Sequence, residues 1–120
     1  MAKVLVHVTC GPNDPSKATL AFFVARAALE EGHSVALFLA GDAVQLFRRA
    51  VVDSLQGLGT GSLREHHDAL LAGGARIFLS GMSAKTRGMT EADWEGRPVE
   101  LGNPTRLVQL AVEYDRVLCY

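Results

Sequence analysis

Short apolar runs alternate with segments of helical periodicity along the 120 residues of this chain. Three runs, 3–9, 34–39 and 76–79, are mostly aliphatic or β-branched, which is typical of strands buried on both faces of a parallel sheet. A fourth run, 116–118, follows the last helical segment. Because parallel strands need crossover connections, this alternation predicts an α/β fold: a three-layer sandwich with a mostly parallel central sheet.

The segments between these runs carry the signals that begin helices. Asp14-Pro15 and Asn103-Pro104 each place a capping side chain before a proline at the first helical position. Asp42 is expected to cap the second helix, whereas 80–88 is expected to be a loop with one helical turn. The predicted helices cover residues 15–31, 42–55, 62–72 and 104–113.

Composition limits the class of protein. With 48% hydrophobic and 21% charged residues, the chain is typical of one globular domain, residues 1–120. The net charge is −1, and both signs are interspersed, so there is no electrostatic basis for binding nucleic acid or an anionic membrane. No run approaches the roughly 20 apolar residues of a membrane-spanning helix, and the first residues lack a signal-peptide pattern. We therefore expect a cytoplasmic protein.

The usual patterns for metals and organic cofactors are missing from the sequence. The two cysteines, Cys10 and Cys119, form neither a disulfide framework nor a zinc-binding spacing. His66 and His67 are adjacent, so on a helix they point about 100° apart and cannot bind one metal together. The glycine-rich segment 57–61 follows a helix, whereas a dinucleotide-binding fingerprint follows a strand. We expect no metal and no cofactor.

The carboxyl ends of the predicted strands indicate where a ligand would bind. In an open parallel sheet, ligands bind beyond these ends, where segments 9–16, 40–42 and 80–88 should converge. Lys85 and Arg87, together with backbone N–H groups, would suit a small anion such as sulfate, phosphate or a persulfide sulfur. A solvated loop face is the alternative. The candidate ligand-binding residues are Thr9, Gly11, Asp14, Gly41, Ser80, Gly81, Ser83, Lys85 and Arg87.

Cys10 is the candidate catalytic residue. It lies between the first strand and the N-terminus of the first helix, whose dipole would lower the pKa of the thiol and favour the nucleophilic thiolate. The alternative is a buried thiol that only packs, because free cysteines are among the most buried residues. We expect Cys119 to pack in the core, and His7 to be a core or interface residue with one hydrogen bond.

Aromatic residues indicate an oligomer. Five phenylalanines, two tyrosines and one tryptophan are too many for one small core, so part of this aromatic surface should meet a partner. Trp94 and Tyr120 are the candidate interface residues. We therefore expect a homo-oligomer.

Four segments occur in an order that resembles a known family. They are the strand 3–8, the loop 11–16 before a long helix, Glu31-Gly32-His33, and the segment 79–89 with its small residues followed by Arg87-Gly88. Together they resemble the DsrE/DsrF-like superfamily of small α/β proteins, with its YchN-like and TusD-like members, over nearly the whole chain. The resemblance implies a three-layer sandwich that assembles as dimers, trimers or hexamers.

The resemblance also implies a role in sulfur handling. Several members of the superfamily carry sulfur as a cysteine persulfide and pass it along a relay, toward tRNA thiolation or in sulfur oxidation, which implies a sulfur-carrier protein as a partner of this chain. Their cysteine lies at the end of the third strand, a position that Ser80 occupies in this chain. A serine hydroxyl cannot hold a persulfide. Two interpretations remain: a persulfide carrier or sulfurtransferase-like protein that uses Cys10, or a non-catalytic oligomeric subunit that binds a small ligand or a partner.

Overall fold

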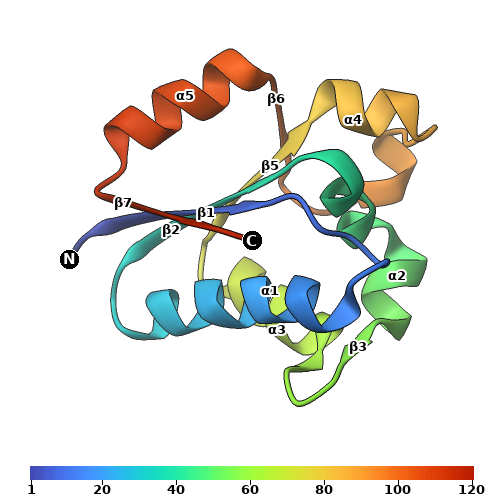
Figure 1. Ribbon diagram of the computed structural model, residues 1–120, viewed down its shortest axis with the longest axis horizontal. Coiled ribbons are helices and arrows are strands. Elements are labelled where there is room, and N and C mark those ends of the chain that lie inside the picture. Colours follow the sequence, from blue (N-terminus) through green and yellow to red (C-terminus); the bar gives the residue numbers. More distant parts are fainter.

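Five parallel strands form the central sheet of the computed structural model, which describes residues 1–120 (Figure 1). Their order across the sheet is β6-β5-β2-β1-β7, and each neighbouring pair is parallel. The predicted α/β fold is thus confirmed, although β6 was not predicted. The strands are β1 (Lys3–Val8), β2 (Ser34–Leu39), β5 (Arg76–Ser80), β6 (Glu100–Gly102) and β7 (Arg116–Cys119).

Helices cover both faces of this sheet, and three of them have the capping side chains that the sequence predicted. Asp14, Ser62 and Asn103 each accept a hydrogen bond from a backbone N–H in the first turn of the helix that follows. No helix has the length and apolar character needed to cross a lipid bilayer. The α-helices are α1 (Pro15–Glu30), α2 (Arg49–Ser54), α3 (Leu63–Ala72), α4 (Gly81–Thr86) and α5 (Pro104–Glu113). Two 3₁₀ helices, η1 (Gly41–Phe47) and η2 (Glu91–Trp94), and a hairpin of β3 (Gln56–Gly57) with β4 (Gly61–Ser62) complete the fold.

Two predicted elements were wrong. The helix expected over 42–55 is divided into η1 and α2, because the backbone of Arg48 between them is extended (φ −66°, ψ 133°). Asp42 does not cap η1, which begins after Ala40 without a side-chain cap. The segment 80–88, expected to be a loop with one helical turn, contains the six-residue helix α4, which begins earlier than expected because the Ser80 side chain caps it.

The two faces of the sheet are unequally covered. The larger core cluster contains 22 buried residues and lies between the sheet and α1, α3 and η1, whereas the cluster under α5 contains six. Side chains alternate along β1, so Val4 and Val6 enter the larger cluster while Leu5 faces α5. Figure 1 shows α1 and α3 on one side of the sheet and α5 on the other.

Strand β7 lies at one edge of the sheet, and this explains its exposure. Cys119, which was expected to pack in the core, is exposed on this edge strand. Its register partner on β1 is His7, which meets Phe38 edge-on with ring centroids 6.0 Å apart. We expected His7 to form one hydrogen bond, but its buried Nε2 has no hydrogen-bond partner. Burial also lowers the pKa of this imidazole.

Candidate functional site

The segments that follow β1, β2 and β5 meet at the carboxyl edge of the sheet. Their strands end side by side, because Val8 pairs with Leu39 and Leu39 pairs with Leu79. The Gly41 N–H then donates to Ser83 Oγ at 2.9 Å, which links the segment after β2 to α4. The predicted convergence of these segments is therefore present, and Gly41, Ser80 and Ser83 belong to one hydrogen-bonded cluster.

Ser80 is almost buried, with 9% of its surface exposed. Its hydroxyl accepts a hydrogen bond from the Ser83 N–H at 3.3 Å and so caps α4. Gly81 begins this helix beside Gly102 of β6, the register partner of Ser80. The role that the structure gives to the Ser80 hydroxyl is therefore to cap α4.

Arg87 has a partner inside the cluster. Its Nε and Nη2 donate to Asp42 Oδ1 at 3.1 and 2.9 Å, and its Nη1 donates to the Ser83 carbonyl at 3.2 Å. Arg48 donates in turn to the Arg87 carbonyl at 2.6 Å. The Asp42 carboxylate therefore balances the charge that the sequence suggested for an anionic ligand.

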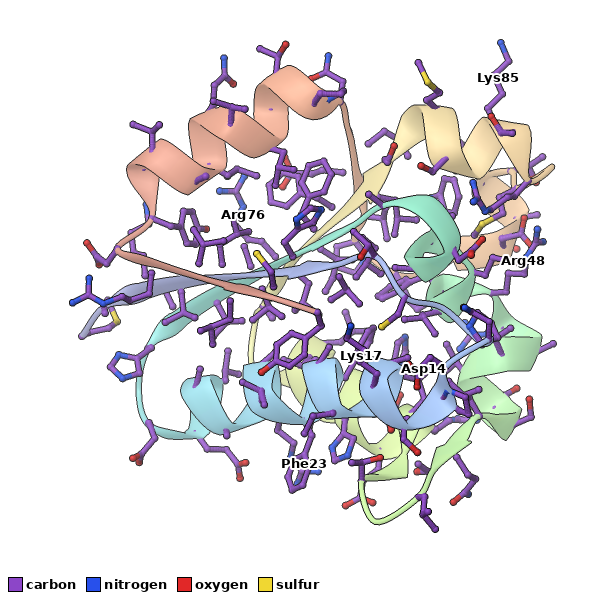
Figure 2. All side chains as sticks on the ribbon, in the orientation of Figure 1. Asp14, Lys17, Phe23, Arg48, Arg76 and Lys85 are labelled. Atoms are coloured by element: carbon purple, nitrogen blue, oxygen red, sulfur yellow. The ribbon has the colours of Figure 1, made fainter.

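The other predicted ligand-binding residues lie around this cluster. Gly11 is buried directly against the backbone of Asp42. The Thr9 hydroxyl donates to the Tyr120 carbonyl at 3.0 Å, and exposed Asp14 caps α1. Lys85 is exposed and points away from the sheet (Figure 2). The structure therefore brings neither Lys85 nor Asp14 into contact with the cluster.

Cys10 is half-buried and packs against the larger core cluster. Burial raises the pKa of its thiol, and the Asp14 carboxylate adds to this rise, while Lys17 partly offsets it. The expected lowering of the pKa was thus wrong in direction. Asp14, which caps the N-terminus of α1, contributes a negative charge near the thiol.

The candidate site is a closed polar cluster at the surface. None of the four surface cavities is lined by Cys10 or Ser80. One cavity of about 450 Å³ lies between β6 and α5, beside Arg106, and one of about 560 Å³ lies at the amino ends of the strands, beside Lys3. No three His, Cys, Asp or Glu side chains gather closely enough to hold a metal ion.

Two charged residues of the cluster were missed from the sequence. Asp42 was interpreted as a helix cap and Arg48 was not singled out, yet both hold Arg87 in place. The sequence did contain a feature that could have predicted the contact between Asp42 and Arg87. Asp42 follows β2 and Arg87 follows β5, and opposite charges after neighbouring parallel strands are brought to the same edge.

Comparisons with known proteins identify the fold. A model of the DsrE/DsrF-like family matches residues 2–120. The crystal structure of the YchN protein from E. coli is 23% identical, with a TM-score of 0.78 and complete coverage of both chains. A protein of unknown function from Methanobacterium thermoautotrophicum is 16% identical, with a TM-score of 0.77 and complete coverage of both chains.

A third similar structure comes from Bacteroides thetaiotaomicron. It is a conserved protein of unknown function, 13% identical, with a TM-score of 0.70, and the match covers 99% of this chain and 95% of that one. A search of the curated proteins finds no match. At these identities the solved structures establish a shared fold.

Proposed function

Because the chain belongs to the DsrE/DsrF-like family, we propose that it acts in intracellular sulfur handling as a non-catalytic subunit. It binds a partner, such as a sulfur-carrier protein, at the carboxyl edge of its sheet and carries no sulfur itself. One observation carries this proposal: Ser80 ends β5, and its hydroxyl caps α4. The resemblance to the family places the sulfur-carrying cysteine there, and a serine hydroxyl forms no persulfide.

The state of Cys10 supports the same proposal. The thiolate, rather than the thiol, is the nucleophile in sulfur chemistry. Burial raises the pKa of Cys10, so the thiol form dominates near neutral pH. Its packing against the larger core cluster also limits access to a donor.

A second candidate function is persulfide carriage by Cys10. It is supported by the position of this free, half-buried thiol at the carboxyl end of β1, where Lys17 favours the thiolate. In that reaction, the Cys10 thiolate attacks the outer sulfur of a donor persulfide. A new S–S bond forms at Cys10, the donor S–S bond breaks, and the donor leaves as a thiolate.

Intact-protein mass after incubation with polysulfide separates the two functions. Cys119 is exposed and would react, so the experiment uses the Cys119→Ser variant. We expect the folded variant to gain no sulfur that cyanide can remove, because Cys10 is half-buried and its raised pKa favours the thiol over the thiolate. The denatured variant should gain sulfur and so serve as the positive control. Uptake by the folded Cys119→Ser variant that disappears in Cys10→Ser/Cys119→Ser would establish Cys10 as a carrier instead.

We also propose that the chain assembles with copies of itself. Trp94 and Tyr120, the candidate interface residues, are half-buried and pack against the larger core cluster. More apolar surface lies on α5, where Val108 and Val112 are 62% and 82% exposed. These residues are one helical turn apart on one face of α5, which favours a contact with another copy.

Light scattering is expected to give a mass that is a multiple of 12.9 kDa. Val112→Glu should shift this mass towards the monomer, because a buried unpaired carboxylate is costly at an interface. Leu58→Glu is the matched control, since Leu58 is 92% exposed in the β3–β4 hairpin and should leave the mass unchanged. A wild-type protein that stays monomeric would contradict this proposal.

A further inference from the structure

Residues 91–97, which we call the strap, comprise η2 and the turn after it. Arg97 fastens the strap to the body of the protein. Its Nη2 donates to the Phe47 carbonyl, its Nη1 lies 2.9 Å from His67 Nε2, and its guanidinium lies over the Phe47 ring, 4.8 Å from the centroid. The remaining contact, to the Asp93 carbonyl, is within the strap. None of these partners is an anion, so the Arg97 guanidinium is held in place by neutral hydrogen-bond acceptors and by the Phe47 ring.

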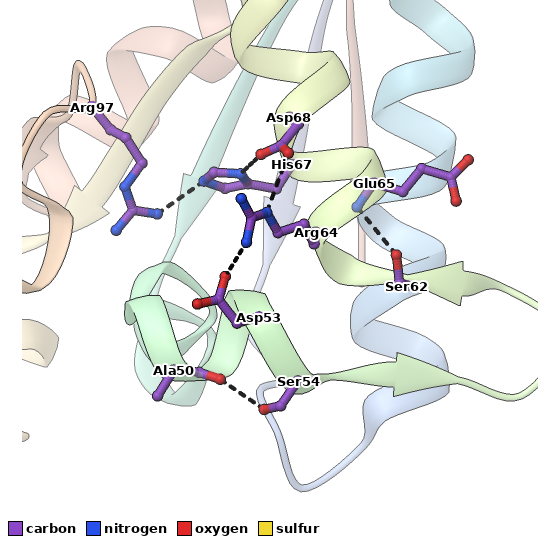
Figure 3. Close-up of polar contacts among 9 residues, drawn as sticks. All are labelled: Ala50, Asp53, Ser54, Ser62, Arg64, Glu65, His67, Asp68 and Arg97. Atoms are coloured by element: carbon purple, nitrogen blue, oxygen red, sulfur yellow. Dashed lines mark hydrogen bonds and ion pairs between the residues drawn. The ribbon is translucent and has the colours of Figure 1, made fainter.

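His67, on α3, is one of these acceptors. The residue is buried, with 2% of its surface exposed, and its ring lies between Arg97 and Asp68 (Figure 3). Nδ1 is 2.8 Å from Asp68 Oδ1, and Nε2 is 2.9 Å from Arg97 Nη1.

Only one form of the imidazole satisfies both contacts. An ionised carboxylate can only accept a hydrogen bond, and a guanidinium can only donate. Nδ1 must therefore carry the proton that Asp68 accepts, and Nε2 must offer its lone pair to Arg97. The observed arrangement requires a neutral His67.

A second proton would remove the acceptor. It would occupy Nε2, where Arg97 now donates, and would place two cations in contact in a buried environment. We propose that His67 is a pH-sensitive latch: its protonation breaks the hydrogen bond to Arg97 and releases the strap from α3.

The charges around His67 set the direction of this switch. Burial is the largest effect and lowers the pKa of His67 below the ordinary 6.5; Asp68 opposes this, whereas Arg97 and Arg49 add to it. A released imidazole would return towards its ordinary pKa, so the open form binds the proton more tightly. Acidification below the ordinary pKa therefore favours release. The charged groups of α3, the strap and α2 around the ring are Asp68, Arg64, Arg97, Asp93, Arg49 and Asp53.

The strap also reaches the candidate site. Asp93 Oδ1 accepts a hydrogen bond from Arg48 at 3.4 Å, and Arg48 donates to the carbonyl of Arg87 at 2.6 Å. Release of the strap would free Arg48 from Asp93 and loosen the support of Arg87. Regulation of partner binding by the strap rests on the proposed function, whereas the latch itself does not.

Trp94 provides a direct readout, because it is the only tryptophan of the chain and lies in the strap, half-buried against the larger core cluster. In a titration from about pH 8 to about pH 5, we expect the emission of Trp94 to shift to the red below pH 6.5. Far-UV circular dichroism should stay constant. The protection factors of the strap amides, which correct for the slower intrinsic exchange at lower pH, should fall over the same range. This result would show release of the strap without unfolding of the protein.

His67→Gln and His33→Gln are the paired variants. Glutamine at position 67 stays neutral and can both donate and accept, so the shift of Trp94 emission should disappear. His33, whose Nδ1 accepts from the Ala2 N–H at the opposite edge of the sheet, should be replaceable without changing the shift. If His67→Gln does not fold, Arg97→Gln gives the second test. It should show the open-strap emission of Trp94 at every pH.

Four results would overturn the latch. They are the absence of a shift in the wild type, a shift that persists in His67→Gln, a shift that coincides with loss of circular dichroism, and a closed-strap emission of Trp94 in Arg97→Gln at neutral pH. None of these measurements uses sulfur or a ligand. Failure of the latch and failure of the proposed function are therefore observed separately.

Discussion

Replacement of Phe47 by alanine is expected to lower the free energy of unfolding by about 3–5 kcal/mol, the range typical of truncating a buried phenylalanine. Phe47 is 1% exposed and has ring-centroid distances of 6.4 Å to Phe22 and 5.2 Å to His67. Its ring also supports the guanidinium of Arg97. The change removes both a core side chain and the surface on which the strap is fastened. Urea denaturation followed by circular dichroism measures the loss.

Phe23→Ala is the matched control for this effect. Phe23 stacks on His66 with ring centroids 4.6 Å apart, but 43% of its surface is exposed. Its truncation should therefore cost clearly less than that of Phe47, because less apolar surface is lost and solvent can fill the space. If Phe47→Ala cost no more than Phe23→Ala, η1 would not be the rigid part of the core that its burial indicates.

Gly11→Ala is expected to destabilise the protein by about 1–3 kcal/mol, although it adds a single methyl group. A Cβ on Gly11 would overlap the backbone carbonyl of Asp42 and come within 2.9 Å of the Asp42 Cβ. Backbone atoms cannot turn aside as a long side chain can. The segment after β1 must therefore move away from the segment after β2, and the hydrogen bond from the Gly41 N–H to Ser83 should weaken. Urea denaturation and the exchange rate of the Gly41 amide measure both effects.

Gly81→Ala tests whether this cost arises from the lack of space. A Cβ on Gly81 would lie 3.7 Å from the Gly102 carbonyl oxygen, which is an ordinary contact. Since Gly81 is the first residue of α4, alanine should be neutral or slightly stabilising there. Equal losses for Gly11→Ala and Gly81→Ala would contradict the explanation by steric overlap.

The sequence predicted the parts of the fold that local signals determine. Asp14-Pro15 and Asn103-Pro104 mark α1 and α5 because a cap and a proline act within one helical turn. It did not predict β6, whose three residues become a strand only by pairing with β5. The apolar spacing over 42–55 predicted one helix, but Arg48, which contacts Arg87 and Asp93, has an extended backbone.

The candidate site was predictable in position but not in chemistry. Convergence of the segments after β1, β2 and β5 follows from parallel strands alone. Neutralisation of Arg87 by Asp42 depends on side-chain contacts between residues 45 apart in the sequence. The pKa of Cys10 is raised chiefly by burial, which depends on the packing of the folded chain rather than on local sequence. Likewise, no pattern in the sequence predicts the contact between Arg97 and His67.

The position of β7 also has a consequence for biosynthesis. One neighbour of β1 is β2, but the other is β7, and the Lys3 N–H bonds the side chain of Asp115. On the ribosome, β1, α1 and β2 are synthesised before residues 116–119 and can begin to pack the larger core cluster without them. Until then, the outer edge of β1 is unpaired and Leu5 has no cover from α5. We expect this open strand edge to make the nascent chain prone to pairing with other strands until β7 forms.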